Sequence, residues 1–412
     1  GYQPTVKKVV NDRRASLDYE GDVLPTMTKL VDEEFRRGSS IAVEPLKTDA
    51  VDIPDRPRLT AVVVGPSLEW TGDPGLRTKV AEWTAGAPAK RRLYPASLVW
   101  CFKKPGRDLR DKVELMLAWR RVELEVAAGN LGPEFDRGDR AELRASVKEA
   151  EDAARDEVWA GYRYAALADT KEADGVRVID LGAGHSSSGE SLTGRVLAAL
   201  KSEALLSDTV APGYIERNWP PPFVETGAWP LGGLRRAFLD GSLTRLVDAD
   251  AVLRAKVPDF ILRGEFGLGS RGPGTSDFQR VWFKEPVAAE ELAFDDSVFL
   301  LGKAVAERLT RAIPPSPDDT PALPPPVPAP AREHTTPAAP RIIRVAGRVP
   351  PEIWNRLGTR LLPKIRGGSD VQIRVELAAT FPGEAAADAL RDLNQALEDL
   401  GIGRDVRVTD GE

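Results

Sequence analysis

The chain has 412 residues, 42% of them hydrophobic and 29% charged, and its net charge is -6. This length predicts two or three soluble domains, and no apolar run approaches the ~18 residues of a membrane span. One cysteine and two histidines exclude disulfides and histidine-rich zinc sites, so we expect no metal site. The acidic balance argues against bulk attraction to nucleic acid or membrane, but it leaves a local basic patch open. Without a signal peptide, we expect a cytoplasmic protein or a piece of a longer one.

Residues 1–57 are expected to form a helical and irregular segment ahead of the first core strand. Two stretches, 6–17 and 24–35, carry helix-like apolar patterns, and the Pro-broken stretch 44–57 follows them. We therefore place the first domain boundary at residue 57.

Residues 58–210 are expected to form part of an α/β core. The stretch 58–64 is a β-branched run ended by Gly65-Pro66, which is typical of a strand buried on both faces. Further buried strands are predicted at 98–102, 162–168 and 176–181. This order of elements is typical of nucleotide-binding cores, although the sequence contains no G-x-x-x-x-G-K-[ST] phosphate loop.

A helical hairpin is predicted within this core, over residues 106–165. Two long apolar stripes at helical spacing are joined near Gly129, and charged residues fill the opposite faces. We interpret the hairpin as a lid held by packing, with its acidic residues as solvated surface.

A glycine-rich turn follows the last predicted strand. Ile179-Asp-Leu-Gly-Ala-Gly184 resembles the first motif of S-adenosylmethionine methyltransferases, in which glycines let the backbone approach the cofactor. The candidate cofactor-binding residues of this weak motif are Gly182, Gly184 and Gly189. Two features oppose this interpretation: no strand ending in an acidic residue follows soon, and Trp219 interrupts the later Asn-Pro-Pro-like motif. The alternative is a turn that simply needs glycine.

Residues 211–312 are expected to form a winged-helix-like domain. Two short helices, the second capped by Asp248, precede a Gly-rich loop over 267–274 and a strand at 278–283. Winged helices contact DNA or serve as protein-packing modules, and both interpretations stay open. The candidate phosphate contacts are Arg235, Arg236, Arg245, Arg254 and Lys256.

The last hundred residues divide into a linker and a small domain. Eleven of the 34 prolines fall within 313–340, which predicts an extended, semi-rigid tether. Residues 341–412 carry the pattern of a compact β-α-β-α-β unit, with alternating apolar residues in the strand near Val371. We interpret this α+β unit as a docking or assembly domain.

Taken in order, these features resemble one known family. The residues that carry the resemblance are Arg92-Leu-Tyr with Leu98-Val-Trp-Cys-Phe102, Leu117-Ala-Trp-Arg120, Tyr162-Arg-Tyr-Ala-Ala-Leu167, Ser191-Leu-Thr-Gly-Arg-Val-Leu-Ala-Ala-Leu200 and Gly264-Glu-Phe-Gly267. They resemble the C-terminal half of large bacterial ATP-binding proteins long labelled a domain of unknown function. That family occurs in phage-defence and restriction islands beside DNA methyltransferases, and it is related to the AAA+-like ATPases of the PglY/BrxC type.

The resemblance implies a division of labour along a longer polypeptide. Members carry a P-loop upstream, so ATP and Mg²⁺ would bind in the full-length protein, and this chain alone would not hydrolyse ATP. The chain would supply the end of a P-loop-type α/β core, the helical lid and modules that dock onto other defence proteins or DNA. Arg91 and Arg92, just before a core strand, become candidate γ-phosphate sensors; a surface pair at the strand entrance is the alternative.

Three functional hypotheses follow. The first is the C-terminal part of an ATPase subunit in an anti-phage defence or DNA-modification system, and an oligomer would suit it. The second is a non-enzymatic adaptor that binds DNA or protein through the winged-helix-like domain. The third is an S-adenosylmethionine methyltransferase.

Overall fold

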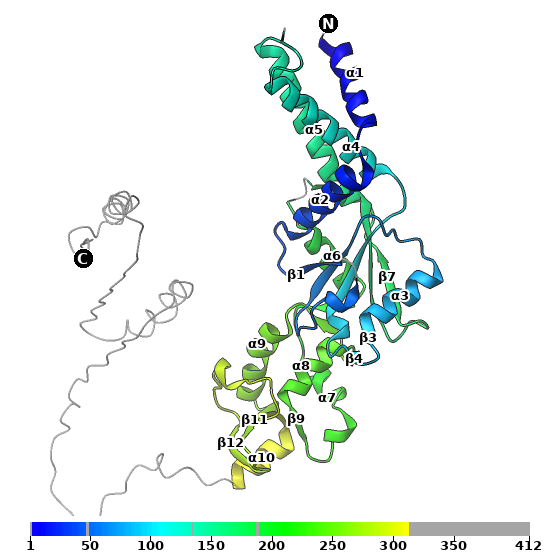
Figure 1. Ribbon diagram of the computed structural model, residues 1–412. Coiled ribbons are helices and arrows are strands. Elements are labelled where there is room, and N and C mark those ends of the chain that lie inside the picture. The colour runs from blue at the N-terminus through cyan, green and yellow to red at the C-terminus, as the bar shows by residue number, and fades with distance from the viewer. Residues whose placement is uncertain (1, 47–48, 134, 187–188, 313–412) are drawn as a thin grey trace, which may run out of the picture. The chain divides into compact units, whose positions relative to one another are not determined.

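The computed structural model describes residues 2–46, 49–133, 135–186 and 189–312 (Figure 1). The predicted linker 313–340 and the predicted domain 341–412 therefore lie outside the described residues. The described part is a mixed α/β structure with several sheets. Within it, no helix is both long and apolar enough to cross a membrane.

A five-stranded sheet forms the centre of the first part of the chain. Its spatial order is β1-β2-β5-β6-β7; β1, β2 and β5 run parallel, whereas β6 and β7 are antiparallel to their neighbours. The four strands predicted in this region are present, and β1, which contains Pro45, is an additional edge strand. The strands are β1 (Ala42–Leu46), β2 (Thr60–Val64), β5 (Leu98–Lys103), β6 (Tyr162–Ala168) and β7 (Val176–Asp180).

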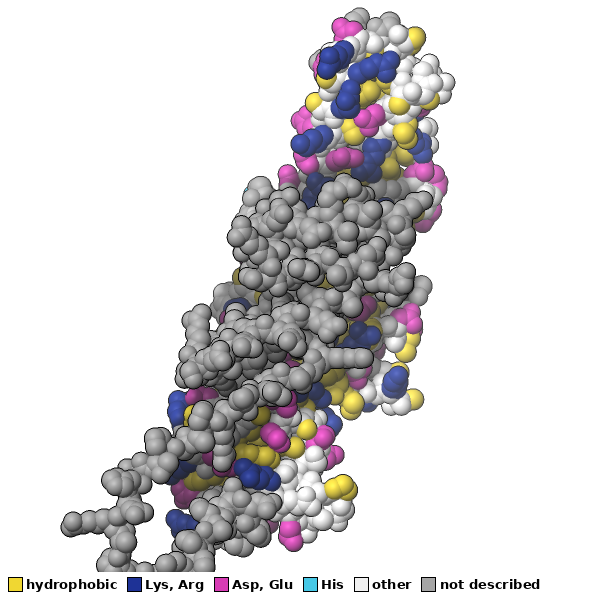
Figure 2. All heavy atoms as spheres, turned by 90° about the vertical axis from the view of Figure 1, so that its left-hand side faces the viewer, with side chains coloured by type: hydrophobic (Ala, Val, Ile, Leu, Met, Phe, Trp, Pro, Cys, Tyr) yellow, Lys and Arg dark blue, Asp and Glu magenta, His cyan; other side chains and the backbone are white. Residues whose placement is uncertain are grey.

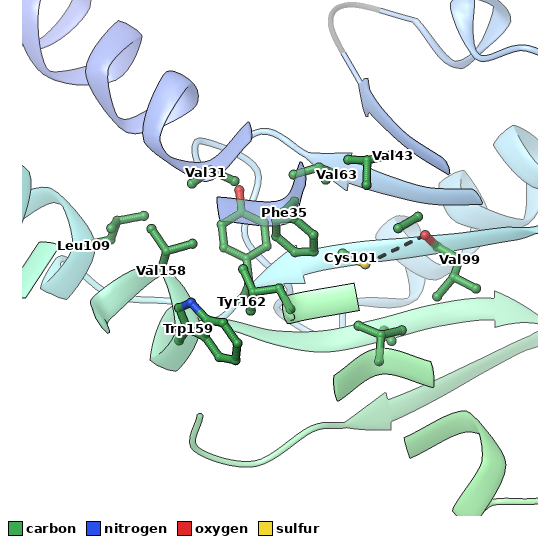
Figure 3. Close-up of a cluster of buried hydrophobic side chains, with 14 of the residues drawn as sticks. Val31, Phe35, Val43, Val63, Val99, Cys101, Leu109, Val158, Trp159 and Tyr162 are labelled. Atoms are coloured by element: carbon green, nitrogen blue, oxygen red, sulfur yellow. Dashed lines mark hydrogen bonds between the residues drawn. The ribbon is translucent and has the colours of Figure 1, made fainter. Parts of the chain in front are cut away.

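Helices cover both faces of this sheet, which explains why its central strands are continuously apolar. Every residue of β2 and β5 is buried. On one face, Val99 and Cys101 pack with residues of the helices α2 (Leu24–Arg36) and α6 (Leu192–Ser202). Figure 3 shows part of this cluster, where Phe35 and Tyr162 meet edge to face at 5.2 Å between ring centroids. On the other face, Trp100 packs with residues of α3 (Pro74–Ala85).

The predicted helical hairpin is present as α4 (Asp108–Ala127) and α5 (Arg137–Gly161). A capping box between Asp136 and Asp139 begins α5 by satisfying free backbone N–H groups. The N-terminal helix α1 (Tyr2–Ala15) packs along α4 through Val6 and Val10. A single π-helical turn, η1 (Tyr19–Val23), leads from α1 into α2.

Basic and acidic side chains are interspersed over the end of the molecule formed by α1, α4 and α5 (Figure 2). Many of them pair across helices, as Arg13 does with Glu125 at 2.6 Å and Arg120 with Glu151 at 2.7 Å. These pairs fit the prediction that the charged faces of the hairpin are solvated surface.

Residues 212–312 form a second region with its own core and a four-stranded antiparallel sheet in the order β12-β11-β13-β9. The two predicted helices and the strand predicted at 278–283 are present, whereas β9, β13 and α10 were not predicted. The predicted Gly-rich loop 267–274 is wrong over most of its length, because β11 (Phe266–Arg271) pairs with strands on both sides. The elements are α7 (Pro212–Arg217), β9 (Ala228–Pro230), α8 (Leu231–Asp240), α9 (Ala249–Leu262), β11 (Phe266–Arg271), β12 (Phe278–Trp282), β13 (Val298–Gly302) and α10 (Lys303–Ala312).

Short elements complete the described chain. Two residue pairs form the small hairpin β3 (Gly86–Ala87) and β4 (Lys90–Arg91) after α3. The strands β8 (Leu206–Ser207) and β10 (Arg245–Leu246) pair in parallel where the two regions meet. The 3-10 turns are η2 (Ala50–Asp52), η3 (Pro95–Ser97), η5 (Pro221–Phe223) and η6 (Ala289–Glu291).

Candidate functional site

The parallel strands β1, β2 and β5 end at the same edge of the sheet, which we call the carboxyl edge. In open α/β sheets, ligands commonly bind outside the carboxyl ends of parallel strands. The loop after β2 and the start of α3 surround an open hollow of about 410 Å³ at this edge. Its lining is mixed polar and apolar: Ser67, Leu68, Glu69, Thr71, Asp73, Leu76 and Pro105.

A buried lysine, Lys103, stabilises the loop that follows β5 at this edge. Lys103, the last residue of β5, is 4% exposed, and its ammonium group donates to the carbonyls of Lys104 at 2.8 Å and Gly106 at 2.9 Å. The same group lies 3.4 Å from a carboxylate oxygen of Glu69, which also accepts from the backbone N–H of Gly106 at 2.7 Å. All three ammonium protons therefore have partners within the protein. Lys103 fixes the loop conformation and is not free to hold a phosphate.

Glu157, near the C-terminus of α5, brings a second carboxyl group to the same edge. Burial raises the pKa of Glu157, and the nearby Lys104 ammonium opposes that shift. The Lys104 Nζ lies 4.0 Å from Oε1 of Glu157, and that oxygen has no hydrogen-bond partner in the described part of the protein. This partly buried carboxyl group therefore favours its protonated form more than an exposed glutamate does.

The described residues contain no group of three or more His, Cys, Asp or Glu side chains placed to hold a metal ion.

The structure places Arg91 and Arg92 at the amino end of β5, on the edge of the sheet opposite to the hollow. Arg92 donates to the carbonyls of Trp83, Ala50 and Ile53, at 3.0, 2.5 and 2.9 Å. Its guanidinium is thus occupied by carbonyls of two backbone segments, the end of α3 and the turn at residues 50–53. Arg91 is exposed in β4. The structure does not bring this pair to the carboxyl edge, where the sensor interpretation needs it.

The start of the glycine turn, Gly182 to Gly184, lies against an arginine. Gly182 and Gly189 have positive φ values of 73° and 71°, which favour glycine. The Arg195 guanidinium donates to the carbonyls of Trp159, Leu181 and Gly182, and it lies against the position that a Cβ on Gly184 would occupy. Residues 187 and 188 lie outside the described residues. This geometry favours the structural alternative, because the arginine fills the space beside the glycines.

The five predicted phosphate contacts have different environments. Arg245 is 7% exposed and donates to the carbonyls of Ala96 and Ala168, so it faces the five-stranded sheet and not solvent. Burial lowers the pKa of Arg245 to about 10.

Arg235 and Arg254 contact the segment 285–297, which crosses α8 and α9. Arg254 donates to the carbonyls of Ala289 and Leu292, and Phe294 lies within 4.9 Å of both the Arg235 and Arg254 guanidinium carbons. Arg235 also pairs with Asp250 at 3.3 Å. The other two predicted phosphate contacts are Arg236, which is exposed, and Lys256, which is partly exposed. Neither side chain has a hydrogen-bond or ion-pair partner among the described residues.

Sequence reasoning missed the polar groups at the carboxyl edge: Glu69, which lines the hollow, and Lys103, Lys104 and Glu157, which lie at the same edge without lining the hollow. The signal that could have found them is the pair Lys103-Lys104 directly after a fully apolar strand, because polar residues at the carboxyl end of a parallel strand commonly face ligands. Strand direction was the missing information.

Comparison of the chain with protein-family models, curated proteins and solved structures gave no match.

Proposed function

We propose that this chain is the C-terminal part of an ATPase subunit of a bacterial anti-phage defence or DNA-modification system. The observation that carries the proposal is the carboxyl edge of the sheet, where three parallel strands end beside a hollow of about 410 Å³ and the base of the helical hairpin. An edge of this kind is the usual location of the nucleotide in α/β cores. The resemblance of the ordered sequence features to ATP-binding defence proteins points the same way.

In this proposal, the chain does not grip the phosphates by itself. The 412 residues contain no P-loop motif. The ammonium group of Lys103 already has three hydrogen-bond partners within the chain, so it is not available to a phosphate. A P-loop would come from sequence outside these residues, together with ATP and Mg²⁺. The role of the chain is to wall the nucleotide site with the loop after β2, to close it with the hairpin, and to dock other defence proteins, such as a DNA methyltransferase.

Steady-state ATP hydrolysis tests this proposal. The 412-residue chain should be inactive, whereas a longer form that carries a P-loop should turn over ATP. In the longer form, Thr71→Arg places a large side chain in the hollow and should lower kcat/KM at least tenfold with unchanged thermal stability. Arg91→Ala, on the opposite edge, should keep full turnover. The reverse pattern, with Arg91→Ala inactive and Thr71→Arg active, would show that the nucleotide site lies elsewhere.

A second candidate function is a non-enzymatic adaptor in which residues 212–312 bind a protein. The observation that favours it is the segment 285–297, which occupies Arg235 and Arg254 and carries four acidic residues beyond Glu285 over the α8–α9 face. A face covered in this way suits a protein partner better than the DNA backbone. Full biological activity of a P-loop variant that cannot hydrolyse ATP would favour this function over the first.

A further inference from the structure

A group of exposed basic residues lies at the amino edge of the five-stranded sheet, opposite to the hollow. We call it the amino-edge patch, and it consists of Arg56, Arg58, Lys90 and Arg91. All four are exposed, and none of their side chains has a hydrogen-bond or ion-pair partner among the described residues. This sets them apart from Arg110, Arg120, Arg121 and Arg155 of the helical hairpin, which are paired with carboxylates.

The fold holds these residues on one edge. Arg58 lies two residues before β2 and Arg91 ends β4, just ahead of β5, and the amino ends of β2 and β5 are neighbours because the two strands pair in parallel. The carboxylate of Asp55 accepts from the backbone N–H groups of Leu93 and Tyr94 at 2.7 and 3.1 Å. Arg56 is therefore tied to the segment that leaves the β3–β4 hairpin.

The acidic residues near the patch are partly used by the backbone. Over residues 49–58 and 79–92 there are six basic and four acidic residues, although the whole chain is acidic. Asp49 caps η2 by accepting from the Val51 N–H, and Asp55 accepts the two N–H groups described above. The other two acidic residues, Asp52 and Glu82, are exposed and accept no hydrogen bond from the backbone among those described. The local potential is thus positive on a protein of net charge -6.

We propose that the amino-edge patch binds the phosphate backbone of a double-stranded nucleic acid. Three of its four members are arginines, whose planar guanidinium groups form bidentate hydrogen bonds with phosphates. The β3–β4 hairpin has the small tip Pro88-Ala89, so a bulky ligand can approach its basic strand closely. This proposal does not rest on the ATPase function, because it concerns the opposite edge of the sheet.

A membrane surface is a less suitable partner for this edge. Binding in a lipid interface requires a continuous apolar face beside the basic residues. The large exposed apolar side chains at this edge of the described structure are Val51 and Leu93, 67% and 53% exposed. Two aliphatic side chains on separate loops do not form such a face, whereas phosphate contacts need charge and access alone.

Fluorescence anisotropy with a labelled 30-base-pair DNA duplex of arbitrary sequence tests the proposal on the full chain. Four phosphate contacts predict a slope of about -3.6 for log affinity against log salt, so binding weakens ~150-fold between 50 and 200 mM salt. Lys90→Glu with Arg91→Glu should weaken binding at least tenfold at 50 mM salt and reduce the slope by about 1.8. Arg56→Ala with Arg58→Ala should reduce it by a similar amount.

A matched control is available in the other basic group. Arg236→Glu with Lys256→Glu makes the same charge change, and it should alter duplex affinity less than twofold. Thermal melts of all variants should coincide with that of the parent chain, because the changed side chains are exposed or partly exposed. The proposal is overturned if the parent chain does not bind the duplex at 50 mM salt, or if the control variant loses as much affinity as the patch variants. Salt-sensitive binding to phosphatidylserine vesicles with no duplex binding would also overturn it.

Discussion

Replacing Tyr162 by phenylalanine removes one buried hydroxyl group with little change in shape. Tyr162 is 1% exposed, and its hydroxyl donates to the carbonyl of Val64 at 2.7 Å, which ties β6 to the end of β2 across the intervening strand β5. Burial raises the pKa of Tyr162 well above its ordinary value, so the hydroxyl stays protonated and remains a donor. The variant leaves the carbonyl without this partner inside the protein.

The expected loss of stability is about 1–2 kcal/mol, the cost of a buried acceptor left without this hydrogen bond. For a unit of this size, that loss lowers the melting temperature by roughly 2–4 °C per kcal/mol. Tyr164→Phe is the matched control, because its hydroxyl has no hydrogen-bond partner among the described residues. Circular dichroism melts would measure both variants. Equal melting temperatures for the two would refute the assignment of stability to the Tyr162 hydrogen bond.

Two further predictions concern charged side chains. Arg245→Met should lower the melting temperature because it leaves the carbonyls of Ala96 and Ala168 without their donor, whereas Arg236→Met at an exposed position should leave it unchanged. Hydrogen bonds from Arg77 hold the pKa of Asp174 at about 2, below the ordinary 3.8. This pair therefore stabilises the fold above about pH 4 and loses that contribution as the pH falls through 2. Asp174→Asn should thus melt lower than the parent chain at pH 6 but together with it near pH 2, and a constant difference would contradict the assignment.

The sequence was sufficient to predict elements whose residues carry an unambiguous pattern. β2 is a run of Ala and Val between polar residues and Gly65-Pro66, and α4 and α5 repeat apolar residues at helical spacing over five or more turns. It was insufficient for β1, where Pro45 interrupts the pattern, and for β13, where four apolar residues are too short to distinguish a strand from a buried turn of helix. Both strands exist because a neighbouring strand supplies their hydrogen bonds.

The candidate sites were harder to predict because residue type does not reveal direction. Arg91-Arg92 and Lys103-Lys104 flank the same strand and look alike in the sequence, yet they lie on opposite edges of the sheet. Arg245 was predicted to be a surface residue because it lies near other arginines in the sequence. Only tertiary packing shows that its guanidinium is buried against backbone carbonyls.

A β-bulge in β6 changes the face of the sheet on which two tyrosines lie, and the sequence pattern does not reveal it. Tyr162 pairs with Lys103 and Tyr164 with Phe102, so Arg163 is an extra residue in the ladder. The bulge sends Tyr162 to the core on one face and Tyr164 to the core on the other, although a regular strand would place both on the same face. Strict alternation therefore assigns one of the two tyrosines to the wrong face.

The short segment 92–96 connects the sheet, the amino-edge patch and the second region. Arg92 fixes the β3–β4 hairpin to the loop after β1, Tyr94 packs with the core of residues 212–312, and the carbonyl of Ala96 accepts from Arg245. A ligand bound at the patch would therefore press on the same residues that join the second region to the sheet. Coupling between them needs no path through the hollow at the carboxyl edge, since every contact lies on the amino side of β5. If the proposed nucleotide site and the proposed duplex site are both correct, they are separated by the length of one buried strand, and both β2 and β5 run from one site to the other.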